Sequence, residues 1–196
     1  MFRIFVILLI MSLPATVKAD LYFGGGYGVG FFNSEVLEQA QVSSTGPSYG
    51  GYVGLKQQFL GLECFYYNAS TKGETIHNKN TYDISTVDNF YGAALRFHLN
   101  FINMRVGYGY HSFKQTFEQD GEPYYGSVAM NKYYDLASEK RMSEGLVLGA
   151  GLLIPINKYS AFYADVATFA MTNINAEMVT VQAGIRFDMP YSIAGK

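Results

Sequence analysis

The sequence predicts an all-β protein, and more narrowly an eight-stranded antiparallel up-and-down transmembrane β-barrel. Three observations support this prediction: apolar residues recur at every second position, short and long connections alternate, and the composition favours strands. The chain has 17 Tyr, 15 Phe and 21 Gly, and only 15% of its residues are charged. Tyr and Phe favour strands, and so low a charge is unusual for a surface that faces water.

The first nineteen residues have the pattern of a secretory signal peptide. Arg3 precedes an apolar run at 4–13, and Val17 and Ala19 follow in the positions of a small-residue cleavage site. The run is too short for a membrane-spanning helix, which needs about 20 residues. We therefore expect cleavage after Ala19. The expected division is a signal peptide (1–19), a transmembrane β-barrel (20–189) and a short C-terminal tail (190–196).

Charge and cysteine content narrow the function. Without Arg3 and Lys18 the 14 basic residues become 14 − 2 = 12, against 16 acidic residues, so the expected mature chain has a charge of 12 − 16 = −4. Proteins that bind nucleic acid usually have a basic stripe, so we expect no nucleic-acid partner. Cys64 is the single cysteine, which excludes an intrachain disulfide.

Eight strand-like segments follow the expected signal peptide, and their connections alternate in length. Connections after the second, fourth and sixth segments are tight, whereas those after the first, third and fifth are long and polar. A meander of this kind puts tight turns on one rim and long loops on the other, as in outer-membrane barrels. The segments are 21–33, 48–57, 60–71, 86–100, 103–118, 143–155, 160–172 and 177–189.

The two faces of the segments indicate which side meets lipid. At 143–154, Leu146, Leu148 and Leu152 alternate with Gly149 and Gly151. A soluble lipocalin-like barrel would carry charges outside, whereas an unbroken apolar face opposite glycines and a few charges is the transmembrane alternation. We expect large inward residues (Phe32, Tyr52, Phe65, Tyr67, Tyr163) and two aromatic girdles (Tyr49, Tyr66, Tyr91, Tyr110, Phe169; and Phe59, Phe97, Phe101, Phe187).

The stretch LYFGGGYGVGFF (21–32) could be mistaken for a phosphate-binding loop. Its glycines at 24, 26, 28 and 30 recur with the strand period and lack the turn spacing of such a loop. Eight strands leave a lumen just wide enough for side chains. We therefore interpret these glycines as lumen lining that leaves room for the large inward residues.

These features resemble the small outer-membrane barrels of the OmpA and OmpX type over essentially the whole expected mature chain. In "QAGIRFDM", Gln182, Gly184, Phe187 and Met189 are similar to the signal on the last strand that the barrel-assembly machinery reads. The resemblance implies a location in the bacterial outer membrane. It also implies contact with outer-membrane lipid and lipopolysaccharide, and with the assembly machinery.

Charged residues on the inward face predict a lumenal network. Buried charges are tolerated when they are paired and hydrogen-bonded. If the turns pair Lys56 with Gly61 and His98 with Arg105, Glu63 lies beside Arg96, and Asp165 lies diagonal to Arg186 with Arg105 nearby. The network (Glu63, Arg96, Arg105, Asp165, Arg186) is either a gate or a structural core that fills the barrel.

The sequence does not favour an enzyme. His111 and Ser112 are adjacent and point to opposite faces of a strand, so they cannot form a nucleophile–base pair. His98 has no serine neighbour, and His77 is expected in a loop. We predict no catalytic residues and no cofactor. We also predict no metal site, because His77 with Glu74 is a weak ligand set.

The longest expected loop, at 119–142, contains Tyr124, Tyr125, Tyr133 and Tyr134. Tyr-rich loops on a rigid scaffold suit contact with an extracellular partner. We therefore predict a barrel with a filled lumen that serves envelope integrity or surface interaction through its loops. The alternatives are a narrow channel for small or hydrophobic solutes, a lipid A-modifying enzyme and a soluble lipocalin-like binder.

Overall fold

The computed structural model describes residues 19–34, 44–77, 79–124, 127–131, 134–137, 139–171 and 176–189. The expected signal peptide up to residue 18 and the expected tail lie outside these ranges. No helix among the described residues is long and apolar enough to cross a membrane.

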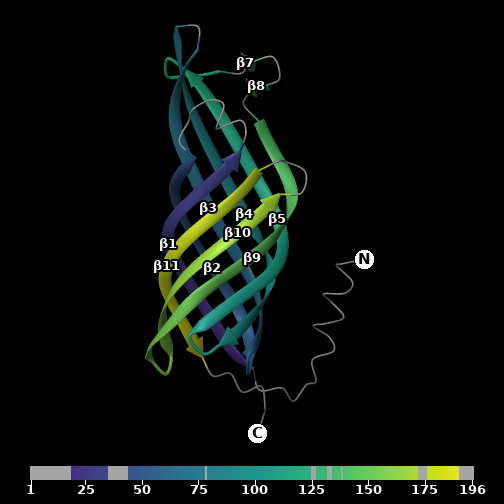
Figure 1. Ribbon diagram of the computed structural model, residues 1–196, viewed down its shortest axis with the longest axis vertical. Helices are drawn as coiled ribbons and strands as arrows, with labels where there is room; N and C mark the ends of the chain where they lie inside the picture. Colours follow the sequence, from purple (N-terminus) through teal and green to yellow (C-terminus); the bar gives the residue numbers. More distant parts are fainter. Residues whose placement is uncertain are drawn as a thin grey trace.

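Eight long strands among the described residues form a closed antiparallel ring (Figure 1). Each strand pairs with its neighbour in the chain, β5 pairs with β9, and β1 pairs with β11 to close the ring. The eight-stranded up-and-down prediction is therefore confirmed. The strands are β1 (Asp20–Ser34), β2 (Thr45–Gln57), β3 (Leu60–His77), β4 (Asn80–Leu99), β5 (Ile102–Gln119), β9 (Glu139–Asn157), β10 (Ser160–Met171) and β11 (Ala176–Met189).

Tight turns connect the strands at one rim, at 58–59, 100–101 and 158–159. The start of β1 lies at the same rim, because Asp20 is in register with Lys56 just before the first of these turns. The end of β11 also lies there, since Met189 pairs with Leu21. In outer-membrane barrels this rim faces the periplasm, so the opposite rim faces outward.

The third and fourth strands run further outward than the sequence predicted. We expected a loop from Lys72 to Ser85, yet β3 and β4 stay paired as far as His77 and Asn80. Strand alternation explains the extension: Tyr82 and Ile84 are buried, whereas Asp83 is exposed. In Figure 1 this hairpin reaches furthest from the tight-turn rim.

Short strands occupy part of the long connection between β5 and β9. The first of them, β6 (Glu122–Pro123), pairs back onto the end of β5. The other two, β7 (Ser127–Asn131) and β8 (Tyr134–Ala137), pair with each other. The connection expected as an irregular loop therefore contains regular structure in its described parts.

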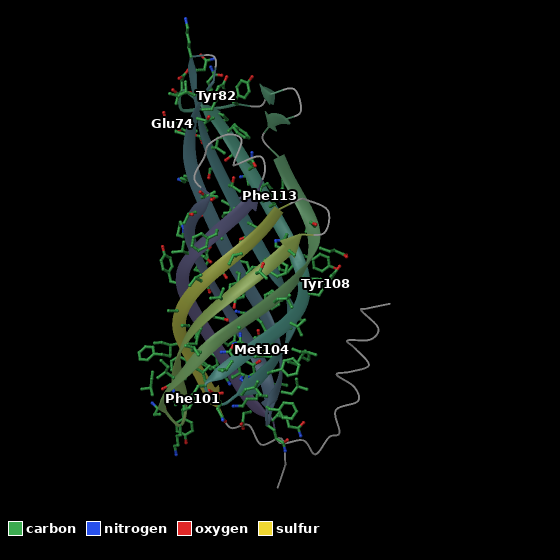
Figure 2. All side chains as sticks on the ribbon, viewed as in Figure 1. Glu74, Tyr82, Phe101, Met104, Tyr108 and Phe113 are labelled. Atoms are coloured by element: carbon green, nitrogen blue, oxygen red, sulfur yellow. The ribbon has the colours of Figure 1, made fainter. Side chains whose placement is uncertain are left out.

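The inward and outward faces agree with the predicted alternation. The five large residues expected inside are at most 5% exposed, whereas Leu148, Leu152 and Ile154 are more than half exposed. Met104 and Tyr108 project from the outer wall of β5 (Figure 2). Phe169 was wrongly expected in an aromatic girdle. It is fully buried, because it shares the inward face of β10 with Asp165 and Ala167.

The glycines of β1 leave space for inward aromatic rings. A Cβ atom at Gly24 would lie 2.7 Å from the ring of Tyr52, and one at Gly26 would overlap the hydroxyl of Tyr163. Both positions lie on the lumen face of β1, as the sequence predicted. Small residues on one strand thus make room for large residues on its neighbours.

Candidate functional site

Four buried charged residues meet at the centre of the lumen. They are Glu63 of β3, Arg96 of β4, Arg105 of β5 and Asp165 of β10, and each is at most 4% exposed. Arg96 donates to Glu63 from Nε at 2.6 Å and from Nη2 at 3.1 Å, which is a bidentate pair. The four residues form the central charge cluster.

The second arginine joins this pair to the fourth residue. Arg105 donates to Asp165, and its Nη1 atom lies 3.6 Å from Oε1 of Glu63. Nη2 of Arg96 lies 3.8 Å from Oδ2 of Asp165. Each guanidinium therefore faces both carboxylates, and the cluster is neutral as a whole.

The register between β4 and β5 makes both carboxylates necessary. Arg96 and Arg105 are direct cross-strand partners, an arrangement that destabilises a sheet unless opposite charges neutralise it. We expected Arg105 opposite His98, but His98 pairs with Asn103. The two-residue difference arises because the two-residue turn lies at 100–101, one position earlier than the expected 101–102, and it leaves every side chain on its expected face.

Arg186 belongs to a separate layer nearer the periplasmic rim. We expected Asp165 diagonal to Arg186, but Asp165 pairs with Gln182, and Arg186 is opposite Ala161. Arg186 thus lies four positions along β11 from Gln182, the partner of Asp165. Arg186 instead donates to Asp188 at 2.5 Å and contacts Nδ1 of His98 at 3.0 Å.

Aromatic rings fill the lumen on both sides of the central charge cluster. On the periplasmic side, the Arg96 guanidinium lies 4.3 Å from the ring centre of Tyr52, and the Tyr52 ring contacts Tyr163 at 5.6 Å. On the outward side, Arg105 donates to Tyr67, and further rings pack above it. The outward layer consists of Phe65, Tyr67, Phe90 and Phe169.

A buried acid–histidine pair lies outward of these rings, and the sequence analysis did not identify it. Nδ1 of His111 lies 2.7 Å from Oδ2 of Asp88, and the imidazole stacks on Phe90 with ring centres 4.0 Å apart. Both residues occupy inward-facing positions in the strand alternation, and that pattern could have revealed the pair. Ser112 lies on the other face, as expected, so it does not extend the pair toward a nucleophile.

The residues similar to an assembly signal lie on both faces of β11. Gln182 is buried in the lumen and donates to Oγ of Ser48 at 2.7 Å. Gly184 follows on the same inward face. Phe187 and Met189 are exposed on the outer wall, where the Phe187 ring stacks on Phe23 at 5.3 Å.

The tyrosines of the longest connection are only partly described. Tyr124 donates its backbone N–H to the carbonyl of Phe117 at 2.9 Å, and its ring packs on Tyr82 at 5.7 Å. Tyr134 begins β8, whereas Tyr125 and Tyr133 lie outside the described residues. No group of three His, Cys, Asp or Glu residues that could hold a metal ion occurs in the described part of the chain.

Removing one carboxylate from the central charge cluster should destabilise the barrel strongly. Glu63→Gln leaves two buried guanidiniums against Asp165 alone, and we expect a loss of about 3–5 kcal/mol. The urea midpoint for loss of the compact gel form in phospholipid vesicles measures this loss. Glu118→Gln is the control, because Glu118 is exposed on the outward end of β5, and it should change stability by less than about 0.5 kcal/mol.

The double variant Glu63→Gln/Arg96→Met makes this test specific to charge. It removes one charge of each sign and should recover part of the loss. Equal stability of Glu63→Gln and Glu118→Gln would show that the cluster does not hold the lumen together.

Comparison with known proteins supports the barrel assignment. Three solved structures illustrate the likeness, each at 13% identity, which supports the fold alone. Ail, the attachment invasion locus protein of Yersinia pestis, was solved with the heparin analogue sucrose octasulfate; its TM-score is 0.55, over 88% of this chain and 100% of Ail. OprG of Pseudomonas aeruginosa has a TM-score of 0.52, over 90% of this chain and 99% of OprG. Neisserial surface protein A has a TM-score of 0.50, over 87% of this chain and 97% of that protein.

A search of curated protein sequences found no match. The sequence itself matches a protein family, described as the outer membrane protein beta-barrel domain, over residues 4–187. That match spans nearly the whole chain, including every strand of the ring except the last residues of β11. The chain therefore belongs to the outer membrane protein beta-barrel domain family.

Proposed function

We propose that this protein is a non-conducting outer-membrane barrel that presents a rigid surface outside the cell. The filled lumen supports the claim that the barrel does not conduct. The central charge cluster spans the lumen from β3 and β4 to β5 and β10, and aromatic layers cover it on both sides. A pore would need a continuous path through these layers.

The outward extension of β3, β4 and β5 supports the claim that the protein presents a rigid surface. Its inward side is a packed layer in which Ile84 and Phe117 are only 2% exposed. The extension is therefore a stiff sheet and does not depend on loop ordering to keep its shape. A stiff sheet loses little conformational entropy when a partner binds to it.

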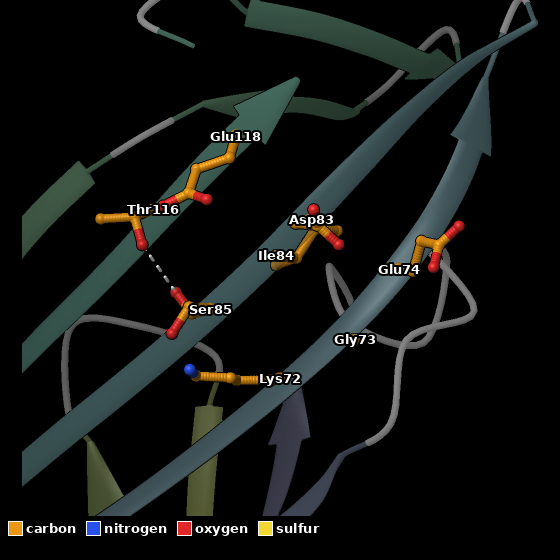
Figure 3. A pocket seen from close by; sticks show the side chains of 8 residues that line it. All are labelled: Lys72, Gly73, Glu74, Asp83, Ile84, Ser85, Thr116 and Glu118. Carbon is orange, nitrogen blue, oxygen red and sulfur yellow. Dashed lines mark hydrogen bonds between the residues drawn. The ribbon is translucent and has the colours of Figure 1, made fainter. Parts of the chain in front are cut away.

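A pocket of about 520 Å³ lies on this extension (Figure 3). A row of carboxylates crosses its outer end, because Glu74 is in register with Asp83 and Asp83 with Glu118. Ail was solved with a polysulfated sugar analogue. The acidic row makes the tip of this extension unsuited to a ligand of that charge, so we favour a neutral or cationic partner there.

The rival function, a narrow channel, has one observation in its favour. The hydroxyls of Tyr52 and Tyr163 and Nε of Arg105 are buried without a hydrogen-bond partner among the described residues. Water inside the lumen would satisfy such atoms. A chain of water molecules would be the beginning of a conducting path.

Conductance in planar bilayers distinguishes a barrel with a filled lumen, which we call the plug, from a channel. We expect the purified protein to give no conductance steps, because no layer of the lumen is open. An open porin under the same conditions serves as the positive control. Steps from the wild-type protein whose size changes in Glu63→Gln would establish a channel and refute the plug.

Shortening the hairpin tests the proposed surface. Thr71 and Thr86 are direct partners, so Asn-Gly in place of residues 72–85 closes β3 and β4 with a two-residue turn. We expect an inserted barrel whose gel mobility still shifts on heating, as that of the wild type does. We also expect bacteria that display it to lose most of their adhesion to surfaces coated with neutral or cationic protein, the class of partner that the acidic row favours. Unchanged adhesion combined with a new sensitivity to detergent would instead indicate a role in envelope integrity.

A further inference from the structure

Two lysines face each other on the outer wall, on the outward side of the membrane. Lys114 of β5 and Lys140 of β9 are direct cross-strand partners, and both are exposed. Lys72 of β3 lies one row further out, on the other side of β4, in register with Ser85. Lys72, Lys114 and Lys140 form the outer lysine patch.

The outer lysine patch is not neutralised within the described part of the protein. Like charges directly opposite each other destabilise a sheet. No ion pair joins these lysines to a described acidic residue, whereas Lys56 at the opposite rim lies 3.5 Å from Asp188. On the same strand face, Glu118 is four residues beyond Lys114 and Glu144 is four residues below Lys140, which is about 13 Å along each strand.

Lys72 lies close to the acidic residue Glu74 on the same strand, but its side chain points away from that carboxylate. In Figure 3 its ammonium extends toward Ser85, whereas the carboxylate of Glu74 points to the other side. Thr116 occupies the position opposite Ser85 on β5 and donates to its backbone carbonyl at 3.4 Å. The row that contains Lys72 therefore continues with two hydroxyl side chains, Ser85 on β4 and Thr116 on β5, the strand that carries Lys114.

The height of the patch on the wall indicates what it meets. Four residues below Lys114, Tyr110 packs beside Tyr91 at 6.1 Å, and Tyr91 is in register with Tyr66. Tyrosines in such a row mark the boundary between hydrocarbon and headgroups. Four residues of a strand tilted by about 40° rise about 10 Å along the membrane normal. The lysines thus lie in the headgroup layer of the outer leaflet.

We propose that the outer lysine patch binds phosphate groups of lipopolysaccharide, the phosphorylated glycolipid of the outer leaflet. A phosphate between Lys114 and Lys140 would receive charge-assisted hydrogen bonds from both ammonium groups and remove their mutual repulsion. The acyl chains of the same molecule would lie below, against exposed residues of β5 and β9 such as Val106, Leu146 and Leu148. The proposal depends on the outer-membrane location and not on the function of the extension.

The acidic row favours lipid over a soluble polyanion. Glu74, Asp83 and Glu118 lie further out than the lysines on the same sheet. A polyanion that approached from outside the cell would meet these carboxylates first and be repelled. A phosphate already in the plane of the membrane reaches the lysines from below and from the side.

Nanodiscs provide the test. The full-length mature protein is placed in phosphatidylcholine nanodiscs with increasing lipopolysaccharide, and the rise in its unfolding temperature measures binding. The test variant is Lys114→Gln/Lys140→Gln. The matched control is Lys79→Gln/Lys158→Gln, which has the same charge change but alters exposed lysines at the hairpin tip and in a periplasmic turn.

We expect the test variant to need about thirtyfold more lipopolysaccharide than the wild type for the same rise, because each lysine near an anionic headgroup strengthens binding about fivefold and two are removed. The control should match the wild type, and dephosphorylated lipopolysaccharide should give little rise for any variant. Equal titrations for test and control variants would overturn the proposal. An undiminished response of the wild type to dephosphorylated lipopolysaccharide would overturn it even if the test variant did not fold. Protection by soluble heparin equal to that by lipopolysaccharide would identify a polyanion site instead.

Discussion

The hydrocarbon interior of a membrane has no hydrogen-bond partners for the backbone, and the rest of this structure depends on that constraint. An unsatisfied N–H or C=O group there costs several kcal/mol, so a sheet can cross only as a closed ring. Pairing of β1 with β11 removes the last pair of edges. Closure fixes the diameter, the diameter fixes how much side-chain volume the lumen holds, and the apolar residues are left for the outer wall.

A narrow closed ring makes the lumen a protein core with unusual contents. The outer wall carries most of the aliphatic side chains, whereas the inward face combines glycines and aromatic rings with buried charges. Arg96 and Arg105 are forced together by the register, and Glu63 and Asp165 neutralise them from two other strands. On the outer wall, Lys114 and Lys140 also face each other across two strands. In our proposal, phosphate groups of the surrounding lipid neutralise these two positive charges.

Period-two alternation was enough to predict the fold, the lipid-facing wall and the inward residues, because each strand of a closed barrel has one face in lipid and one in the lumen. Alternation does not fix which residues are opposite one another. The predicted His98–Arg105 and Asp165–Arg186 neighbours were wrong for that reason, since register depends on the exact position of each connection, and both connections lie one residue earlier than expected. The extension of β3 and β4 was also missed, because its polar outer face, with Lys72 and Glu74, looks like a loop.

A transmembrane barrel requires the apolar face of its strands to meet lipid, and Cys64 tests this directly. It is the single cysteine of the chain and is exposed on the outer face of β3, between Leu62 and Tyr66. A nitroxide attached to it in a reconstituted bilayer can be relaxed by dissolved oxygen, which partitions into lipid, or by a water-soluble nickel complex. We predict strong relaxation by oxygen and almost none by nickel. Strong relaxation by nickel would place this face in water and contradict the transmembrane barrel.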